Sequence, residues 1–161
     1  MKRFRLPIAA LVCAAVIQSA LLAAGVVIND TPSLPEGFYR KTDRPVGKGC
    51  FVLFRLPPSE LSARPYARHN LIKEVVAVEG DHVCIDARGV QVNGLTLANS
   101  VPLPTDRDGV PLPRLTLADY TLRPGELLTM STHNPRSFDS RYFGPVSSSR
   151  VISVIEPLLT W

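Results

Sequence analysis

The sequence predicts a mainly β domain that follows a single apolar helix at the N-terminus. Residues 6–28 form a run of 23 residues that carries no formal charge. Beyond this run, short segments rich in β-branched residues alternate with clusters of Gly, Pro, Asn and Asp, a pattern typical of strands joined by turns. No segment after residue 28 has the apolar periodicity of a long amphipathic helix.

The apolar run is predicted to be a transmembrane anchor. As a helix it would be about 34 Å long, which exceeds the roughly 30 Å hydrocarbon core of a bilayer. Lys2, Arg3 and Arg5 precede or begin it, and no acidic residue occurs before Asp30. The positive-inside rule therefore predicts a cytoplasmic N-terminus. A cleaved signal peptide is the alternative, but residues 22–25 (LAAG) match a cleavage site poorly.

These features divide the chain into a cytoplasmic N-terminus with its anchor, 1–28, and an exported domain, 29–161. The formal net charge is +4, from 18 basic and 14 acidic residues. Because three of the positive charges lie at the start of the chain, the exported domain is nearly neutral. A nearly neutral domain does not indicate a nucleic-acid partner.

The cysteines leave one question open. Cys13 lies inside the apolar run and is expected to pack as a small apolar residue. Cys50 and Cys84 lie in the exported part, where an oxidising compartment permits a disulfide between them. Their separation in space does not follow from the sequence, so the bridge stays open. No CxxC motif or Cys/His cluster occurs, and we expect no metal and no cofactor.

Apolar runs bounded by Gly and Pro predict strands along the exported part, two of them joined as a hairpin. They are 37–40, 50–54, 71–78, the hairpin 82–86 with 89–94, 126–131 and 151–155. Residues 99–124 contain five prolines and are predicted to be an extended surface excursion rather than core. Residues 133–144 are predicted to be a polar loop.

Ser33 is a candidate nucleophile. Pro32 and Pro35 restrict the backbone around it, directly after the predicted anchor. An ordinary Ser/Pro linker is the alternative. A nucleophilic serine needs a base, but none of His69, His82 and His133 stands in a clear Ser-His-acid pattern.

Lys73 is the alternative base. It shares one face of the strand 71–78 with Leu71, Val75 and Ala77. Burial on that face would lower the pKa of the ammonium from about 10.4, as a base at neutral pH requires. A solvated lysine on an edge strand is the competing interpretation.

Three segments together resemble the type I signal peptidase family. They are 31–35 (TPSLP), 71–81 (LIKEVVAVEGD) and 137–146 (SFDSRYFGPV), and they follow the apolar run in the family's order. The third segment carries the most specific motif. The resemblance extends from the apolar run to Trp161.

This resemblance implies a signal-peptidase-like β-sheet domain and a serine endopeptidase with a Ser/Lys dyad. Ser33 is the implied nucleophile and Lys73 the implied general base. The Thr31 hydroxyl and the Ser33 backbone N–H are the implied oxyanion hole, and Ser137 is implied to orient the lysine.

A charged pair is also implied near the site. Asp139 and Arg141 match a pair that shapes the wall of the family's site. Their implied role is structural rather than chemical.

Two departures narrow the resemblance. Leu34 stands where many members have Met, and Glu74 follows Lys73 where a basic residue is usual. With the short core and the PEGFY sequence of residues 35–39, these features resemble the TraF-type branch from conjugative transfer systems. Members of that branch act on pilin precursors and, in some systems, cyclise the product.

The expected function is therefore the processing of a conjugative pilin precursor by a peptidase of the bacterial inner membrane, with a periplasmic catalytic domain. The expected partners are a membrane-tethered pilin or secreted precursor, the lipid bilayer and other conjugative transfer proteins. Two alternatives stay open: a general type I signal peptidase, and a non-catalytic assembly factor of the transfer apparatus.

Overall fold

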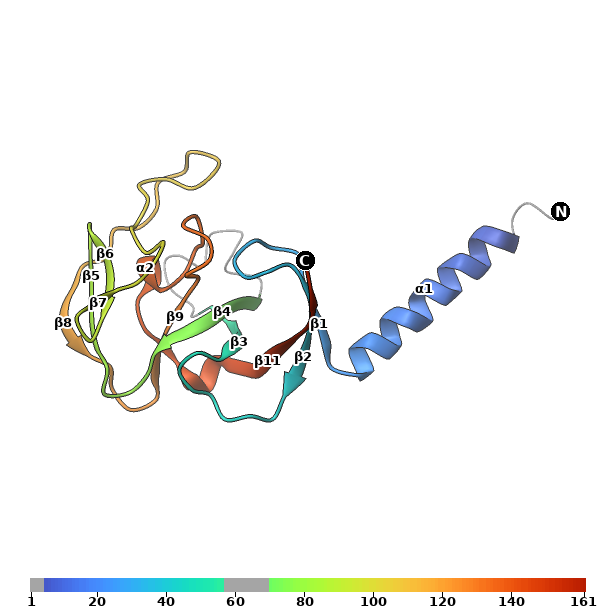
Figure 1. Cartoon of the computed structure of the whole chain (residues 1–161). Helices are drawn as coiled ribbons and strands as arrows, with labels where there is room; N and C mark the ends of the chain where they lie inside the picture. The colour runs from blue at the N-terminus through green and yellow to red at the C-terminus, as the bar shows by residue number, and fades with distance from the viewer. Residues whose placement is uncertain (1–4, 57–69) are drawn as a thin grey trace.

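The chain folds into two antiparallel sheets preceded by one helix (Figure 1). The computed structural model describes residues 5–56 and 70–161. The elements are α1 (Arg5–Ala23), β1 (Val26–Asn29), β2 (Gly37–Thr42), β3 (Phe51–Arg55), β4 (Asn70–Ala77), β5 (His82–Asp86), β6 (Gly89–Val92), β7 (Leu95–Thr96), β8 (Leu117–Thr121), β9 (Glu126–Met130), α2 (Ser140–Phe143), β10 (Val146–Ser147), η3 (Ser148–Arg150) and β11 (Val151–Thr160). The mainly β prediction is confirmed.

The larger sheet has seven strands in the order β1-β2-β11-β3-β4-β9-β10. The C-terminal strand β11 thus lies between β2 and β3, and it is twice as long as the predicted strand 151–155. β4 lies between β3 and β9, with Val52 opposite Lys73 and Thr129 opposite Val75. Lys73 is therefore in an interior strand, and the edge-strand interpretation of this residue is wrong.

The smaller sheet has four strands in the order β7-β6-β5-β8. Its apolar face packs against the end of β4 and against β9, so one core joins the two sheets. The buried members of this core are Val76, Ala77, Val83, Ile85, Val90, Val92, Leu122, Leu128 and Met130.

The prediction for residues 99–124 is wrong at its C-terminal end. Leu117–Thr121 forms β8, which pairs with β5, and Leu122 is buried. The Pro-rich sequence conceals this strand because its five residues stand between Pro113 and Pro124. Residues 101–112 do leave the core, and Thr105 and Pro111 form a single β-bridge there. We call residues 103–112 the excursion loop.

The N-terminal segment differs from its prediction. α1 ends at Ala23, and Val26–Asn29 pairs with β2, so the last residues of the predicted anchor belong to the sheet. In the described ranges 5–56 and 70–161, we find no helix with the length and apolar character needed to span a bilayer. The transmembrane prediction is therefore unsupported, and the predicted orientation stays a prediction.

The Cys50–Cys84 disulfide is not formed, because both residues are free thiols. Cys50 packs beside β3 in the seven-stranded sheet, whereas Cys84 lies in β5 of the other sheet. Cys13 is a free and exposed thiol in α1.

The turn from β1 to β2 carries Ser33, and its far end is fixed by a close backbone approach. Gly37 begins β2 with φ 149°, and a Cβ placed there would lie 2.1 Å from the carbonyl oxygen of Leu159 in β11. Only glycine fits this position. The close packing of β2 against β11 at Gly37 thus fixes the residue at which the turn ends and β2 begins.

Candidate active site

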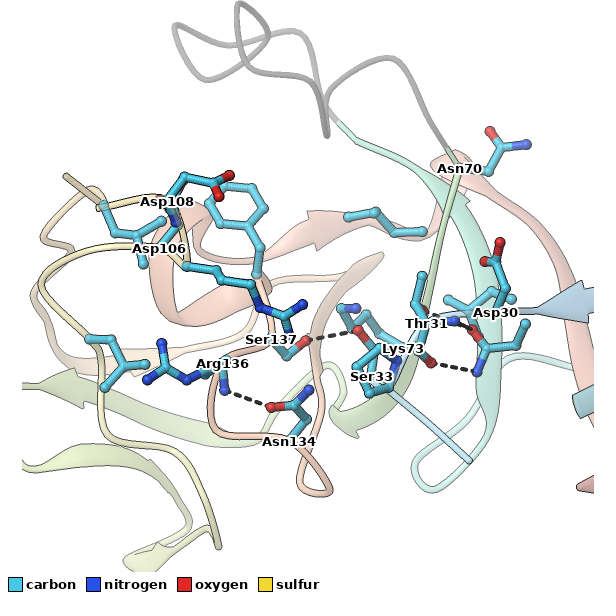
Figure 2. Close-up of a pocket in the computed structure, with 18 of the residues that line it drawn as sticks. Asp30, Thr31, Ser33, Asn70, Lys73, Asp106, Asp108, Asn134, Arg136 and Ser137 are labelled. Atoms are coloured by element: carbon cyan, nitrogen blue, oxygen red, sulfur yellow. Dashed lines mark hydrogen bonds between the residues drawn. The ribbon is translucent and has the colours of Figure 1, made fainter. Parts of the chain in front are cut away.

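One pocket of about 800 Å³ lies between the turn that carries Ser33, strand β4, the excursion loop and the loop before α2 (Figure 2). Ser33, Lys73 and Ser137 all line it, so segments more than 100 residues apart in the sequence meet there. Apolar and charged residues share the rest of the lining. They include Ile28, Leu71, Ile72, Leu103, Leu112, Phe138, Asp30, Asp106, Arg107, Asp108 and Arg136.

The buried side chain of Asn29 folds the turn around Ser33. Its Nδ2 donates to the carbonyl oxygens of Thr31, Leu34 and Pro35, at 3.0, 3.1 and 3.1 Å. The carbonyl of Pro35 also accepts from the hydroxyl of buried Tyr39 at 2.7 Å. These bonds satisfy backbone groups that have no partner strand, and they hold the turn in one shape.

Ser33 is half-buried and is contacted by two other serines. The Ser137 hydroxyl donates to Ser33 Oγ at 3.4 Å, and the Ser131 hydroxyl donates to the carbonyl oxygen of Ser33. Both partners come from the segment between β9 and α2. The structure therefore brings the predicted Ser137 to the predicted nucleophile.

Lys73 is 3% exposed and projects into this pocket from β4. Burial is the main cause that lowers the pKa of its ammonium from 10.5 to about 8; Asp139 opposes the shift and Arg141 adds to it. No hydrogen bond joins Lys73 to Ser33 in the described residues. Catalytic hydrogen bonds are often long before substrate binds.

Thr31 lines the pocket, but its hydroxyl is engaged. It donates to Oδ1 of Asn29 at 2.8 Å. A hydroxyl has a single proton to donate. Thr31 must therefore turn away from Asn29 before it can donate to an oxyanion.

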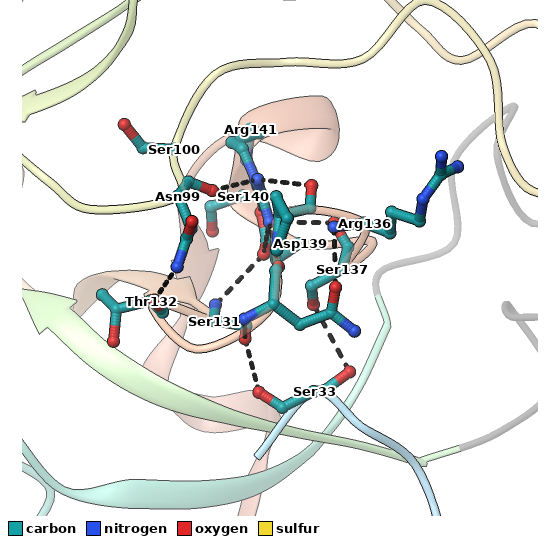
Figure 3. Close-up of polar contacts among 12 residues, drawn as sticks. Ser33, Asn99, Ser100, Ser131, Thr132, Arg136, Ser137, Asp139, Ser140 and Arg141 are labelled. Atoms are coloured by element: carbon teal, nitrogen blue, oxygen red, sulfur yellow. Dashed lines mark hydrogen bonds and ion pairs between the residues drawn. The ribbon is translucent and has the colours of Figure 1, made fainter.

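Asp139 and Arg141 form a fully buried ion pair behind the pocket (Figure 3). The guanidinium donates to both carboxylate oxygens, at 2.8 and 2.7 Å. It also donates to four backbone carbonyl oxygens, which are those of Asn99, Asn134, Pro135 and Ser137. The implied charged pair thus exists, and it ties the loop of Ser137 to the base of the excursion loop.

Asp139 also organises the chain on its own side. Its carboxylate caps α2 by accepting from the Arg141 N–H, and it accepts from the Ser131 N–H at 3.1 Å. All its oxygen contacts are therefore with groups that shape the loop, as a structural role requires.

The histidines are not brought to this pocket where they are described. His82 pairs with Thr121 in the smaller sheet, and His133 lines a shallow hollow with Trp161. His69 lies outside the described residues. Glu74, next to Lys73, accepts from the Thr132 hydroxyl at 3.0 Å and does not line the pocket.

Three parts of this site were not predicted from the sequence: Asn29, Ser131 and the excursion loop. Asn29 carries a usable signal, because an Asn that precedes a Pro-containing turn commonly bonds the backbone of that turn. Ser131 and the excursion loop carry no comparable signal, since their places depend on how distant segments meet.

The pocket thus brings together a half-buried serine and a buried lysine whose pKa is lowered. The family model for "Signal peptidase, peptidase S26" matches residues 1–159 of the chain. A plasmid transfer protein TraF from Escherichia coli is 41% identical over 160 residues, covering 92% of this chain and 90% of the relative. The chain belongs to the signal peptidase family, peptidase S26, and is a serine peptidase.

Other relatives carry related names. A conjugal transfer protein TraF from Agrobacterium tumefaciens (strain 15955) is 36% identical over 174 residues, covering 92% of each chain. A solved structure of signal peptidase I from Enterococcus faecalis V583 is 19% identical with a TM-score of 0.43, covering 71% of this chain and 100% of that one. The family model and the TraF relatives confirm the resemblance seen in the sequence.

Proposed function

We propose that the chain is a Ser/Lys endopeptidase that matures a pilin precursor for conjugative transfer. The observation that supports it most directly is the position of Lys73. Its ammonium is buried in the pocket that Ser33 lines, and its pKa of about 8 makes a fraction of it neutral at physiological pH. The relatives named plasmid or conjugal transfer protein TraF support the setting of conjugative transfer.

The first half-reaction forms an acyl-enzyme. Neutral Lys73 accepts the hydroxyl proton of Ser33 while Ser33 Oγ attacks the scissile carbonyl carbon. The developing oxyanion accepts from the Ser33 N–H and from the Thr31 hydroxyl, once substrate has drawn Thr31 away from Asn29. The Lys73 ammonium then gives its proton to the leaving amine as the C–N bond breaks.

The second half-reaction depends on which nucleophile enters. Water gives a linear product and regenerates Ser33. An amine at the substrate's own N-terminus gives a cyclic product, which is lighter than the linear product by one water. Lys73 takes a proton from the entering nucleophile in either case, so the same residues serve both outcomes.

Ser137 has a defined part in this scheme. Its hydroxyl already touches Ser33 Oγ. The Arg141 guanidinium holds the Ser137 carbonyl at 3.1 Å, so the position of this residue is fixed from behind the pocket. In the proposal Ser137 guides the Ser33 hydroxyl and the Lys73 amine toward each other, closing the gap between them by a side-chain movement.

Two alternatives from the sequence remain as outcomes of the substrate test: a general signal peptidase and a non-catalytic assembly factor. We expect the co-expressed protein to shorten a conjugative pilin precursor and to leave an unrelated secreted precursor intact, with both products measured by intact mass. Cleavage of both precursors would favour the general peptidase. Cleavage of neither would favour the assembly factor.

The same cells report location. We include membrane association in the proposal, because residues 6–28 carry no formal charge and the chain belongs to the signal peptidase family. Fractionation of the cells should recover the chain with the membranes after a salt wash. Full recovery in the soluble fraction would contradict this part of the proposal.

The pH dependence of cleavage should follow Lys73. With the pKa of its ammonium at about 8, the neutral amine falls tenfold for each pH unit below that value. We expect kcat/KM to rise with pH up to about 8 and to level off above it, measured on a soluble precursor peptide. A midpoint near 6.5, the ordinary value of histidine, would contradict lysine as the base.

A further inference from the structure

Ser131 connects the loop before α2 to the backbone of the nucleophile. It follows β9 directly and is fully buried. Its hydroxyl donates to the carbonyl oxygen of Ser33 and accepts from the Asn134 N–H at 2.9 Å, while its own N–H donates to Asp139 at 3.1 Å (Figure 3). Its three partners are thus the predicted nucleophile Ser33 and two residues, Asn134 and Asp139, of the loop between β9 and α2.

We propose that Ser131 is a positioning residue, whose hydroxyl fixes the peptide plane that follows Ser33 and thereby the direction of the Ser33 Cα–Cβ bond, which carries Oγ. The Ser33 carbonyl belongs to the Ser33–Leu34 peptide. Holding that oxygen restricts rotation about the Cα–C bond of Ser33. This inference rests on the proposed peptidase function.

The turn around Ser33 needs a hold from this side. Asn29 bonds the carbonyls of Thr31, Leu34 and Pro35, but it does not bond that of Ser33. Between Thr31 and Leu34, Asn29 leaves the carbonyls of Pro32 and Ser33 unbonded, and Ser131 donates to that of Ser33. Asn29 therefore fixes the turn from within. Ser131 ties Ser33, at the centre of the turn, to the end of β9, the strand that pairs with β4.

Ser131 is not a proton carrier in this arrangement. Its hydroxyl proton is engaged in the hydrogen bond to the Ser33 carbonyl, and a serine hydroxyl has no second proton to donate. It lies next to Asp139 in the network, and Asp139 raises the pKa of Lys73. A loss of Ser131 that acted through Lys73 would shift the pH midpoint of cleavage, whereas a loss of positioning would lower the rate at every pH.

Ser140 provides a matched control. It is 1% exposed, and its hydroxyl also makes two contacts, accepting from the Thr129 N–H at 3.0 Å and pairing with the Thr129 hydroxyl at 3.3 Å. These contacts join β9 to α2 without reaching Ser33. Ser131→Ala and Ser140→Ala therefore remove the same atom from equally buried sites that differ in their link to the nucleophile.

The experiment measures kcat and KM for precursor cleavage, their pH dependence and the melting temperature of each variant, in the full chain. We expect Ser131→Ala to lower kcat about 100-fold, with KM and the pH midpoint unchanged, because a small misplacement of a reacting group has an effect of this size. Ser140→Ala should keep the wild-type kcat, and its melting temperature should fall about as much as that of Ser131→Ala.

Three results would overturn the proposal: wild-type kcat in Ser131→Ala, an equal loss of kcat in Ser140→Ala, or a shifted pH midpoint in Ser131→Ala. If Ser131→Ala does not fold, Ser131→Cys replaces it, since it keeps the volume and supplies only a weak donor; a folded Cys variant with wild-type kcat also overturns the proposal. Inactive wild-type protein, by contrast, would contradict the peptidase function itself.

Discussion

Ser33→Ala and Lys73→Met proteins are expected to leave the pilin precursor uncleaved. Removing either member of a nucleophile–base pair typically lowers the rate by roughly 10⁴-fold or more, because the remaining member has no partner for proton transfer. Both variants should fold. Intact mass of the precursor after co-expression is the measurement, and full processing by Lys73→Met protein would rule out lysine as the base.

The same two variants should differ in stability. The pKa of the Lys73 ammonium is about 8 in the folded protein and 10.5 when exposed. Between these values the unfolded chain binds more protons, so the free energy of unfolding rises with pH from about 8 to 10.5. Below about 8 both states are protonated, and folding carries the full cost of burying the charge, about 3 kcal/mol.

Lys73→Met removes that cost and keeps an apolar stem of similar length. We therefore expect a gain in the free energy of unfolding of about 3 kcal/mol at pH 7, fading as the pH passes 10.5. Ser33→Ala should leave the free energy of unfolding close to wild type. Urea titrations at pH 7 and pH 10 provide the comparison, and a Lys73→Met protein less stable than wild type at pH 7 would contradict it.

Arg141→Met is expected to destabilise the fold by about 3–5 kcal/mol. The substitution leaves the fully buried carboxylate of Asp139 without its cation. It also removes the donor to four backbone carbonyls in part-buried or buried hydrogen bonds, and acceptors that lose their donor away from water are costly. The measurement is the urea midpoint with an unchanged slope.

The chain contains a matched control for this prediction. Asp86 and Arg88 have the same spacing and the same 2.7 Å separation as Asp139 and Arg141, but the Arg88 side chain is 80% exposed. Solvent screens such a pair. Arg88→Met should therefore leave the urea midpoint unchanged, and equal effects of the two substitutions would contradict the role assigned to burial.

The sequence was informative where local pattern and local chemistry coincide. The two-residue period of a strand predicts one face for Leu71, Lys73, Val75 and Ala77, but the register shifts between Val75 and Ala77, and Ala77 packs with Val76 instead. The burial of Lys73 followed less directly, since that required β4 to lie between β3 and β9. The contacts of Ser131 with Ser33 join residues 98 apart in the chain and depend on the fold as a whole.

Two predictions failed because a segment's local sequence pattern did not decide its structure. Pairing with a distant strand decided it instead. The prolines around 117–121 conceal a strand that β5 recruits. Residues 26–28 continue an apolar run, yet they belong to β1 because they pair with the backbone of β2. In both cases the deciding partner is a strand elsewhere in the sequence.

Main-chain atoms at and just before the start of the excursion loop bond residues of α2. The Asn99 carbonyl accepts from Arg141 at 2.6 Å, and the Leu103 N–H donates to the Tyr142 hydroxyl at 3.0 Å. Neither bond uses the side chain at its loop end. Side chains between Thr105 and Leu112 can therefore be substituted without loss of these two bonds to α2. A substitution in this stretch would change the lining of the pocket and leave Ser33 and Lys73, which belong to other segments, in place.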